Sequence, residues 1–162
     1  MSSTGDIRLV WSNAAGGSDV QVELNDLSVD DGLRTAVLLS LFLDRRAEET
    51  DVLPDAGTDR RGWWADSLAE ISGDRIGSLL WLLSRSKNLQ EALSRAEEYS
   101  REALRWLLED KVAERVEVSA AAASGNKLEL LVEVYRPHQK EPTSFRFESP
   151  WTAEMARAAG VT

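Results

Sequence analysis

The sequence predicts an α+β fold, with an N-terminal β-hairpin, three main helices and a C-terminal antiparallel β-sheet. Two changes in hydrophobic period carry this prediction. Apolar residues alternate with polar ones near the N-terminus, recur at helical spacing in the middle of the chain, and alternate again from near Ala113. At 162 residues the chain is large enough for one domain with a real core. The expected parts are a single α+β domain over 1–136, made of a hairpin at 6–25, a helical core at 30–112 and a sheet from 114, followed by an edge strand and mobile tail over 137–162.

The N-terminal hairpin is predicted from two alternating runs. Every second residue is apolar over 7–11 and again over 20–24, and the intervening run at 13–18 (NAAGGS) has the composition of a turn. A two-stranded hairpin is marginally stable alone, so we expect it to pack on the rest of the domain.

The first helix is expected to begin at Asp30. Ser28 or Asp30 can cap it, and an acidic residue suits the positive N-terminal end of a helix. Residues 36–43 (AVLLSLFL) are apolar on every helical face, which indicates burial in a core or an assembly. Arg45 and Arg46 would then lie at its C-terminal pole.

Two further helices are expected. The second would start at 72–74 (SGD) and carry an apolar stripe over 76–83. Asn88 can cap the third, with Glu91 three residues later, and the amphipathic pattern runs on to Glu109. Its outer charges, including ordered i,i+4 pairs, are interpreted first as a solvated face.

The C-terminal sheet is expected to contain three strands. Alternation over 114–121 is followed by a turn at 124–126 and a second alternating run over 127–136. Phe145 and Phe147 indicate a third strand, at an edge of the sheet.

The strand at 127–136 has apolar residues on both of its sides. Leu131 and Tyr135 lie opposite its core-facing residues, so we predict that they bind a partner. The segment 137–142 holds two prolines and cannot pair continuously. The strand edge is therefore either open to a partner's strand or covered by the segment around Phe145 and Phe147.

Residues 44–64, called the docking loop below, repeat an Asp-Arg-Arg triplet and end in two adjacent tryptophans. Arginine suits forked pairing with carboxylates, and large exposed rings are frequent at interfaces. The alternative is that the triplets form local caps and salt bridges that pin the loop. We expect at least one Trp to pack on the core helices, and an arginine of the second triplet to pair with a carboxylate. The predicted partner-binding residues of the loop are Asp44, Arg45, Arg46, Asp59, Arg60, Arg61, Trp63 and Trp64.

Little in the sequence indicates catalysis. There is no cysteine, and the single histidine, His138, stands beside a proline after a predicted strand. No nucleophile elbow or phosphate-binding glycine loop is present, and the acidic residues near Asp55 lack the spacing of a calcium loop. We therefore expect no enzyme activity, cofactor or metal. Paired carboxylates leave a glycoside hydrolase acting on cell-wall sugars as the alternative.

The net charge of −9 argues against non-specific binding to nucleic acid or to anionic membranes. The N-terminus lacks the basic region and following apolar run of a signal peptide, so none is expected. The apolar runs are too short to span a bilayer as a helix. We therefore expect neither a nucleic acid nor a membrane among the partners.

Several blocks of the chain resemble the phage Mu-type baseplate wedge proteins, a family distantly related to the T-even phage "lysozyme-like" baseplate component. The likeness covers most of Asp6 to Val118, and Asp59-Arg60-Arg61 is the nearest counterpart of an acidic-proline-arginine motif in the distant relatives, here without the proline. The blocks are 31–46, 51–55, 59–64, 76–85 and 99–108.

This resemblance implies a non-enzymatic α+β subunit of a contractile tail baseplate. It implies larger wedge proteins and tail sheath subunits as partners, with several copies in a baseplate ring. It also implies a location in the virion, after assembly in the bacterial host cytoplasm. The residues alone leave a small adaptor unrelated to phage as a further possibility.

Overall fold

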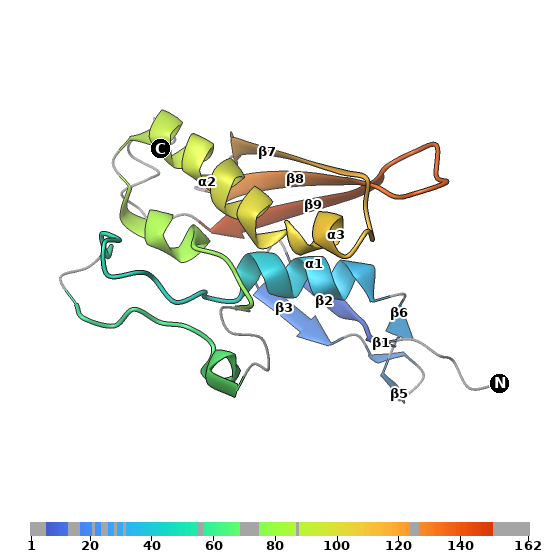
Figure 1. Ribbon diagram of the computed structural model, residues 1–162, viewed down its shortest axis with the longest axis horizontal. Helices are drawn as coiled ribbons and strands as arrows, with labels where there is room; N and C mark the ends of the chain where they lie inside the picture. The colour runs from blue at the N-terminus through green and yellow to red at the C-terminus, as the bar shows by residue number, and fades with distance from the viewer. Residues whose placement is uncertain are drawn as a thin grey trace.

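The protein has the α+β architecture expected from its sequence, as the computed structural model in Figure 1 shows. Helix α1 lies between a three-stranded sheet and a short N-terminal hairpin. The structure describes residues 6–12, 17–20, 22–23, 26–27, 29–30, 32–54, 57–68, 75–86, 88–123 and 127–150. The expected turn at 124–126, the expected helix start at 72–74 and the tail at 151–162 lie outside the described residues.

The N-terminal hairpin is confirmed, with somewhat different bounds. β2 (Leu9–Ser12) pairs antiparallel with β3 (Gly17–Val20), so the second strand begins inside the segment expected to be the turn. Two further antiparallel pairs join β1 (Asp6–Ile7) to β6 (Val29–Asp30) and β4 (Val22–Glu23) to β5 (Asp26–Leu27).

Helix α1 spans Leu33–Phe42 and contains no exposed residue, as its apolar sequence predicts. Its start is later than expected. The capping residue is Gly32 at φ 80°, without a side-chain cap, rather than Ser28 or Asp30. The helix also ends before the arginines, since the Leu43 backbone is already extended, so they do not lie in its last turn.

The prediction of a second α-helix is wrong, because residues Leu80–Arg85 form the 3₁₀ helix η2. Upstream, Ser78 pairs with Asp44 as an isolated parallel bridge, in which Ser78 N–H donates to Leu43 O and Arg45 N–H to Ser78 O. These backbone groups are then no longer available for a helix. Gly77, at φ +97°, permits this approach, since a Cβ there would lie 2.4 Å from Leu43 O.

The third expected helix is present in two pieces. α2 spans Leu89–Ala103 and is capped by Asn88, whose side chain accepts from Glu91 N–H as predicted. The chain then turns, and a single-turn α3 follows at Trp106–Glu109. The described residues therefore contain two main α-helices instead of three, together with η2 and the 3₁₀ helix η1 (Trp64–Leu68).

The C-terminal sheet has the order β7–β8–β9 and is antiparallel throughout. β7 spans Arg115–Ala123, β8 Lys127–Tyr135 and β9 Thr143–Pro150. β9 is an edge strand, as expected, but β8 is the central strand. Its two edges are both paired within the chain, so the possibility that β8 waits for a partner's strand is wrong.

The main core lies between α1 and the inner face of this sheet. Every second residue of β8, from Leu128 to Val134, is buried, which reflects the period of a strand with one face on a core. The hairpin joins this core through Trp11, which stacks on Phe42 with ring centroids 4.0 Å apart and meets the edge of Phe147 at 6.1 Å. Within the described residues, no helix combines the length and apolarity that a membrane crossing requires.

Candidate docking site

The two Asp-Arg-Arg triplets lie side by side and close the docking loop on itself. Arg61 Nη1 is 2.9 Å from Asp44 Oδ2, and Arg46 Nη1 donates to Arg61 O at 3.2 Å. Ala47 N–H donates to Arg60 O. Gly62, at φ +109°, allows the two halves of the loop to approach closely. Any other residue would place a Cβ 2.8 Å from Arg46 Cβ.

Further contacts fasten the loop to the domain. Arg45 Nη1 lies 2.8 Å from Glu102 Oε1 on α2. Trp81 donates from Nε1 to Arg45 O at 2.9 Å, and the Arg61 guanidinium lies 4.5 Å from the centre of the Trp81 ring. The expected pairing of a second-triplet arginine with a carboxylate is thus present, in the ion pair of Arg61 with Asp44.

The remaining triplet residues form hydrogen bonds with the backbone of the loop. Arg60 donates to the carbonyl oxygens of Glu48 and Glu49, and Asp59 Oδ1 accepts from Arg61 N–H at 2.8 Å. Each exposed contact contributes little alone, but together they hold the loop in one shape. The triplets therefore stabilise the conformation of the loop through contacts within the chain.

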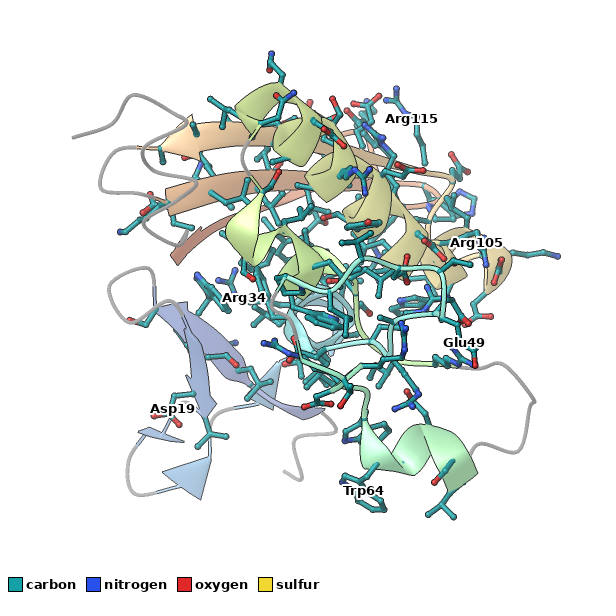
Figure 2. The ribbon with its side chains drawn as sticks, turned by 90° about the vertical axis from the view of Figure 1, so that its left-hand side faces the viewer. Asp19, Arg34, Glu49, Trp64, Arg105 and Arg115 are labelled. Carbon is teal, nitrogen blue, oxygen red and sulfur yellow. The ribbon has the colours of Figure 1, made fainter. Side chains whose placement is uncertain are left out.

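The two tryptophans at the end of the loop are exposed, which differs from the expectation that at least one packs on the core helices. Trp63 is 42% exposed and Trp64 73%, and their ring centroids lie 5.9 Å apart. Trp64 begins η1, whose last residue, Leu68, is 71% exposed. Figure 2 shows Trp64 projecting from the side of the molecule opposite the sheet. Fastening the loop has left an apolar surface facing solvent.

Leu131 and Tyr135 lie on the outer face of the sheet, away from the core, and both are partly buried. Tyr135 donates from its hydroxyl to Glu117 Oε2 at 3.2 Å, and the Arg115 guanidinium lies 3.8 Å from the centre of its ring. Partial burial, followed by the charges of Glu117 and Glu133, raises the pKa of Tyr135 above its ordinary value.

The free edge of β7 is covered by two α2 side chains that sequence reasoning assigned to a solvated face. Glu97 Oε1 accepts from Ala120 N–H at 3.2 Å, and Arg101 Nη2 donates to Val118 O at 3.3 Å. The two side chains also form an ion pair at 2.7 Å. Their i,i+4 spacing was visible in the sequence, but the strand edge beside them was not.

The free edge of β9 is covered at one point only within the described residues. Trp11 Nε1 donates to Glu148 O at 2.8 Å, so the backbone groups of Glu148 face away from β8. Because alternate residues of a strand direct their backbone groups to the same side, those of Ser144 and Arg146 face outward as well. No hydrogen bond of the described residues reaches them. They form an open template for pairing.

The described residues show no arrangement typical of a catalytic or metal centre. They contain no group of three or more His, Cys, Asp or Glu that could hold a metal ion. His138 is exposed in a turn at φ 66°.

Comparison with known proteins identifies the family. A family model described as "Phage protein GP46" matches residues 33–141. The chain belongs to the phage GP46 family. It is 48% identical to "Baseplate protein gp46" of Escherichia phage Mu over 111 residues, which cover 68% of this chain and 71% of that protein. It is 38% identical to "Mu-like prophage FluMu protein gp46" of Haemophilus influenzae over 142 residues, which cover 87% and 95%.

Membership of the GP46 family confirms the resemblance to Mu-type baseplate proteins found in the sequence motifs. The matched span contains α1, the docking loop, α2, β7 and β8, whereas the β2–β3 hairpin and β9 lie outside it. The match continues to residue 141, so the likeness extends beyond Val118, where the motif comparison ended.

Proposed function

We propose that this GP46-family chain is a structural subunit of a contractile tail baseplate wedge, in the virion, that bridges larger wedge proteins and the first ring of tail sheath. The name of the phage Mu relative, a baseplate protein, supports a role in a baseplate. Several copies would stand in a ring after assembly in the host cytoplasm. No observation on the described residues favours the alternative of a glycoside hydrolase.

The observation that carries this proposal is the docking loop. Ion pairs and carbonyl contacts hold its backbone, while Trp63 and Trp64 at its end remain exposed, as does Leu68 at the end of η1. Rigid aromatic side chains contribute most to binding when a partner buries them, and a fixed loop loses little entropy on docking. We assign the larger wedge proteins to this surface.

The second contact uses the open edge of β9. A strand from a sheath subunit can pair with the outward backbone groups of Ser144 and Arg146. The corresponding edge of β7 is occupied by Glu97 and Arg101, so β9 is the edge at which a strand can be added without displacing other contacts.

The docking loop is tested by the double substitution Trp63→Ala and Trp64→Ala. Since both rings are exposed, we expect the thermal unfolding temperature to change by no more than about 2 °C. Incorporation of the chain into sedimented tail particles should fall about tenfold or more, since two large rings would no longer be buried at the contact.

The matched control is Leu108→Ala, which removes an apolar side chain of similar exposure, 42%, from another part of the surface. It should leave incorporation unchanged. Normal incorporation of the double Trp variant would refute the assignment of this surface. A large fall in unfolding temperature would show instead that the rings support the fold.

A further inference from the structure

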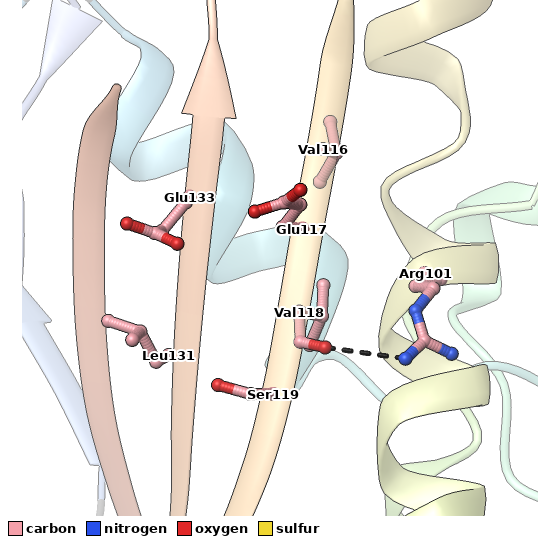
Figure 3. A pocket seen from close by; sticks show the side chains of 7 residues that line it. All are labelled: Arg101, Val116, Glu117, Val118, Ser119, Leu131 and Glu133. Atoms are coloured by element: carbon pink, nitrogen blue, oxygen red, sulfur yellow. Dashed lines mark hydrogen bonds between the residues drawn. The ribbon is translucent and has the colours of Figure 1, made fainter. Parts of the chain in front are cut away.

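Two carboxylates oppose one another on the outer face of the sheet. Glu117 of β7 and Glu133 of β8 are direct cross-strand partners in the register, and Figure 3 shows both on the same side of the two strands. Like charges directly opposite one another destabilise a sheet. A local arrangement that opposes folding is a frequent mark of a functional surface.

The charges around this pair leave one carboxylate uncompensated. Glu117 receives Arg115 Nη1 at 2.6 Å and the Tyr135 hydroxyl at 3.2 Å. The carboxylate of Glu133 has no ion pair or hydrogen bond within the described residues. The nearby Arg101 is already held by Glu97 and the Val118 carbonyl oxygen.

The pair borders a shallow hollow of about 340 Å³. Leu131 gives the hollow an apolar wall, next to Ser119 across the strand pair. A long basic side chain combines an apolar stem with a charged head, and its two parts match this wall and the carboxylates. The lining residues are Arg101, Val116, Glu117, Val118, Ser119, Leu131 and Glu133.

We propose that this hollow receives a Lys or Arg side chain from a segment of a neighbouring baseplate protein. The stem lies on Leu131 and the charged head between Glu117 and Glu133, so that docking relieves the repulsion present in the free chain. The inference rests on the proposed baseplate role and adds to it a third contact, with a stated partner chemistry. It also explains why Leu131 remains on an outer face.

The test is Glu133→Gln in the full chain, compared with Glu129→Gln. Glu129 lies on the same strand and face and is opposite Glu148, but both of these charges have cationic partners, Arg146 at 3.8 Å and Lys127 at 3.0 Å respectively. Removing the repelling charge should raise the unfolding temperature of the Glu133 variant by about 1–3 °C at low salt. The gain should shrink as salt screens the repulsion.

The same variant should assemble poorly despite its greater stability. We expect the yield of tail particles containing Glu133→Gln to fall about tenfold or more, through loss of a charged contact, while Glu129→Gln gives a normal yield. A normal yield for Glu133→Gln would overturn the proposal. So would a fall in its unfolding temperature, since Glu133 would then support the fold.

A photo-crosslinking phenylalanine derivative at the exposed Ala121, on the same face, identifies the partner. In assembled particles we expect a crosslink to another baseplate protein, next to a Lys or Arg. A crosslink to a second copy of this chain, to a segment without Lys or Arg, or no crosslink in particles that contain the chain would each refute the proposal. Absence of the chain from tail particles would instead refute the baseplate role itself.

Discussion

Tyr135 reports on the charges of the outer sheet face. Its pKa is raised by partial burial first, and then by the charges of Glu117 and Glu133 and a hydrogen bond to Glu117, against a smaller opposite effect of Arg115. Because the pKa in the folded chain lies above the ordinary value of 10.0, the fold holds the phenol proton more tightly than the unfolded chain does. Its contribution to stability is therefore complete below the unfolded pKa and is lost as pH rises through the folded pKa.

We predict that Glu133→Gln lowers the pKa of Tyr135, because it removes one of the negative charges that oppose tyrosinate. The chain has two tyrosines, so a Tyr99→Phe background leaves Tyr135 as the one reporter. Ultraviolet absorbance of tyrosinate during a pH titration gives the pKa. In the same background, Arg115→Ala should move the pKa in the opposite direction. A pKa unaffected by Glu133→Gln would mean that burial and Glu117 produce the shift without Glu133.

Among the elements, α2 has a second role besides covering the core. Its Glu97 and Arg101 occupy the outward N–H and C=O groups of β7, as a neighbouring strand would. Uncovered strand edges are sites of unintended association between chains. The pair thus leaves β9 as the edge open to a partner's strand within the described part of the sheet.

We predict that Glu97→Ala combined with Arg101→Ala causes self-association through β7, detectable by sedimentation as a dimer or larger species. Loss of two contacts at about 1 kcal/mol each should also lower the unfolding temperature by several degrees. The control, Glu91→Ala with Arg95→Ala, removes an equivalent i,i+4 pair of α2, joined at 2.9 Å, that makes no contact with the strand edge within the described part of the chain. A monomeric Glu97 and Arg101 variant at high concentration would rule out this protective role.

How far the elements could be predicted from sequence depended on the range of the contacts that define them. The Asn88 cap and the alternation of β8 are local, and both were correct. The helix expected after 72–74 failed because Ser78 pairs with Asp44, a contact that no local pattern encodes. The repeated triplets could be found in the sequence. Their contacts with each other and the exposure of Trp63 could be seen only in the folded loop.

For the whole molecule, the proposed contacts lie on separate surfaces. The docking loop projects from the side opposite the sheet, whereas the open edge of β9 lies next to the N-terminal hairpin. The edge is held in place by the ring cluster of Trp11, Phe42 and Phe147, which joins hairpin, helix and strand. Such a separation allows one chain to contact two partners at once, which the proposed bridging role requires.

The open edge is tested by Arg146→Pro, which removes an outward-facing N–H without removing a hydrogen bond to β8. Proline is tolerated at such edge positions, so the chain should fold and enter the baseplate through its docking loop. Sheath polymerisation on those baseplates, scored by electron microscopy, should be strongly reduced, since the added strand loses its aligned donor. Arg146→Ala is the matched control, because it removes the same side chain but keeps the N–H, and it should support normal sheath. Equal sheath formation on both variants would exclude strand addition at β9 and leave the bridging role to side-chain contacts.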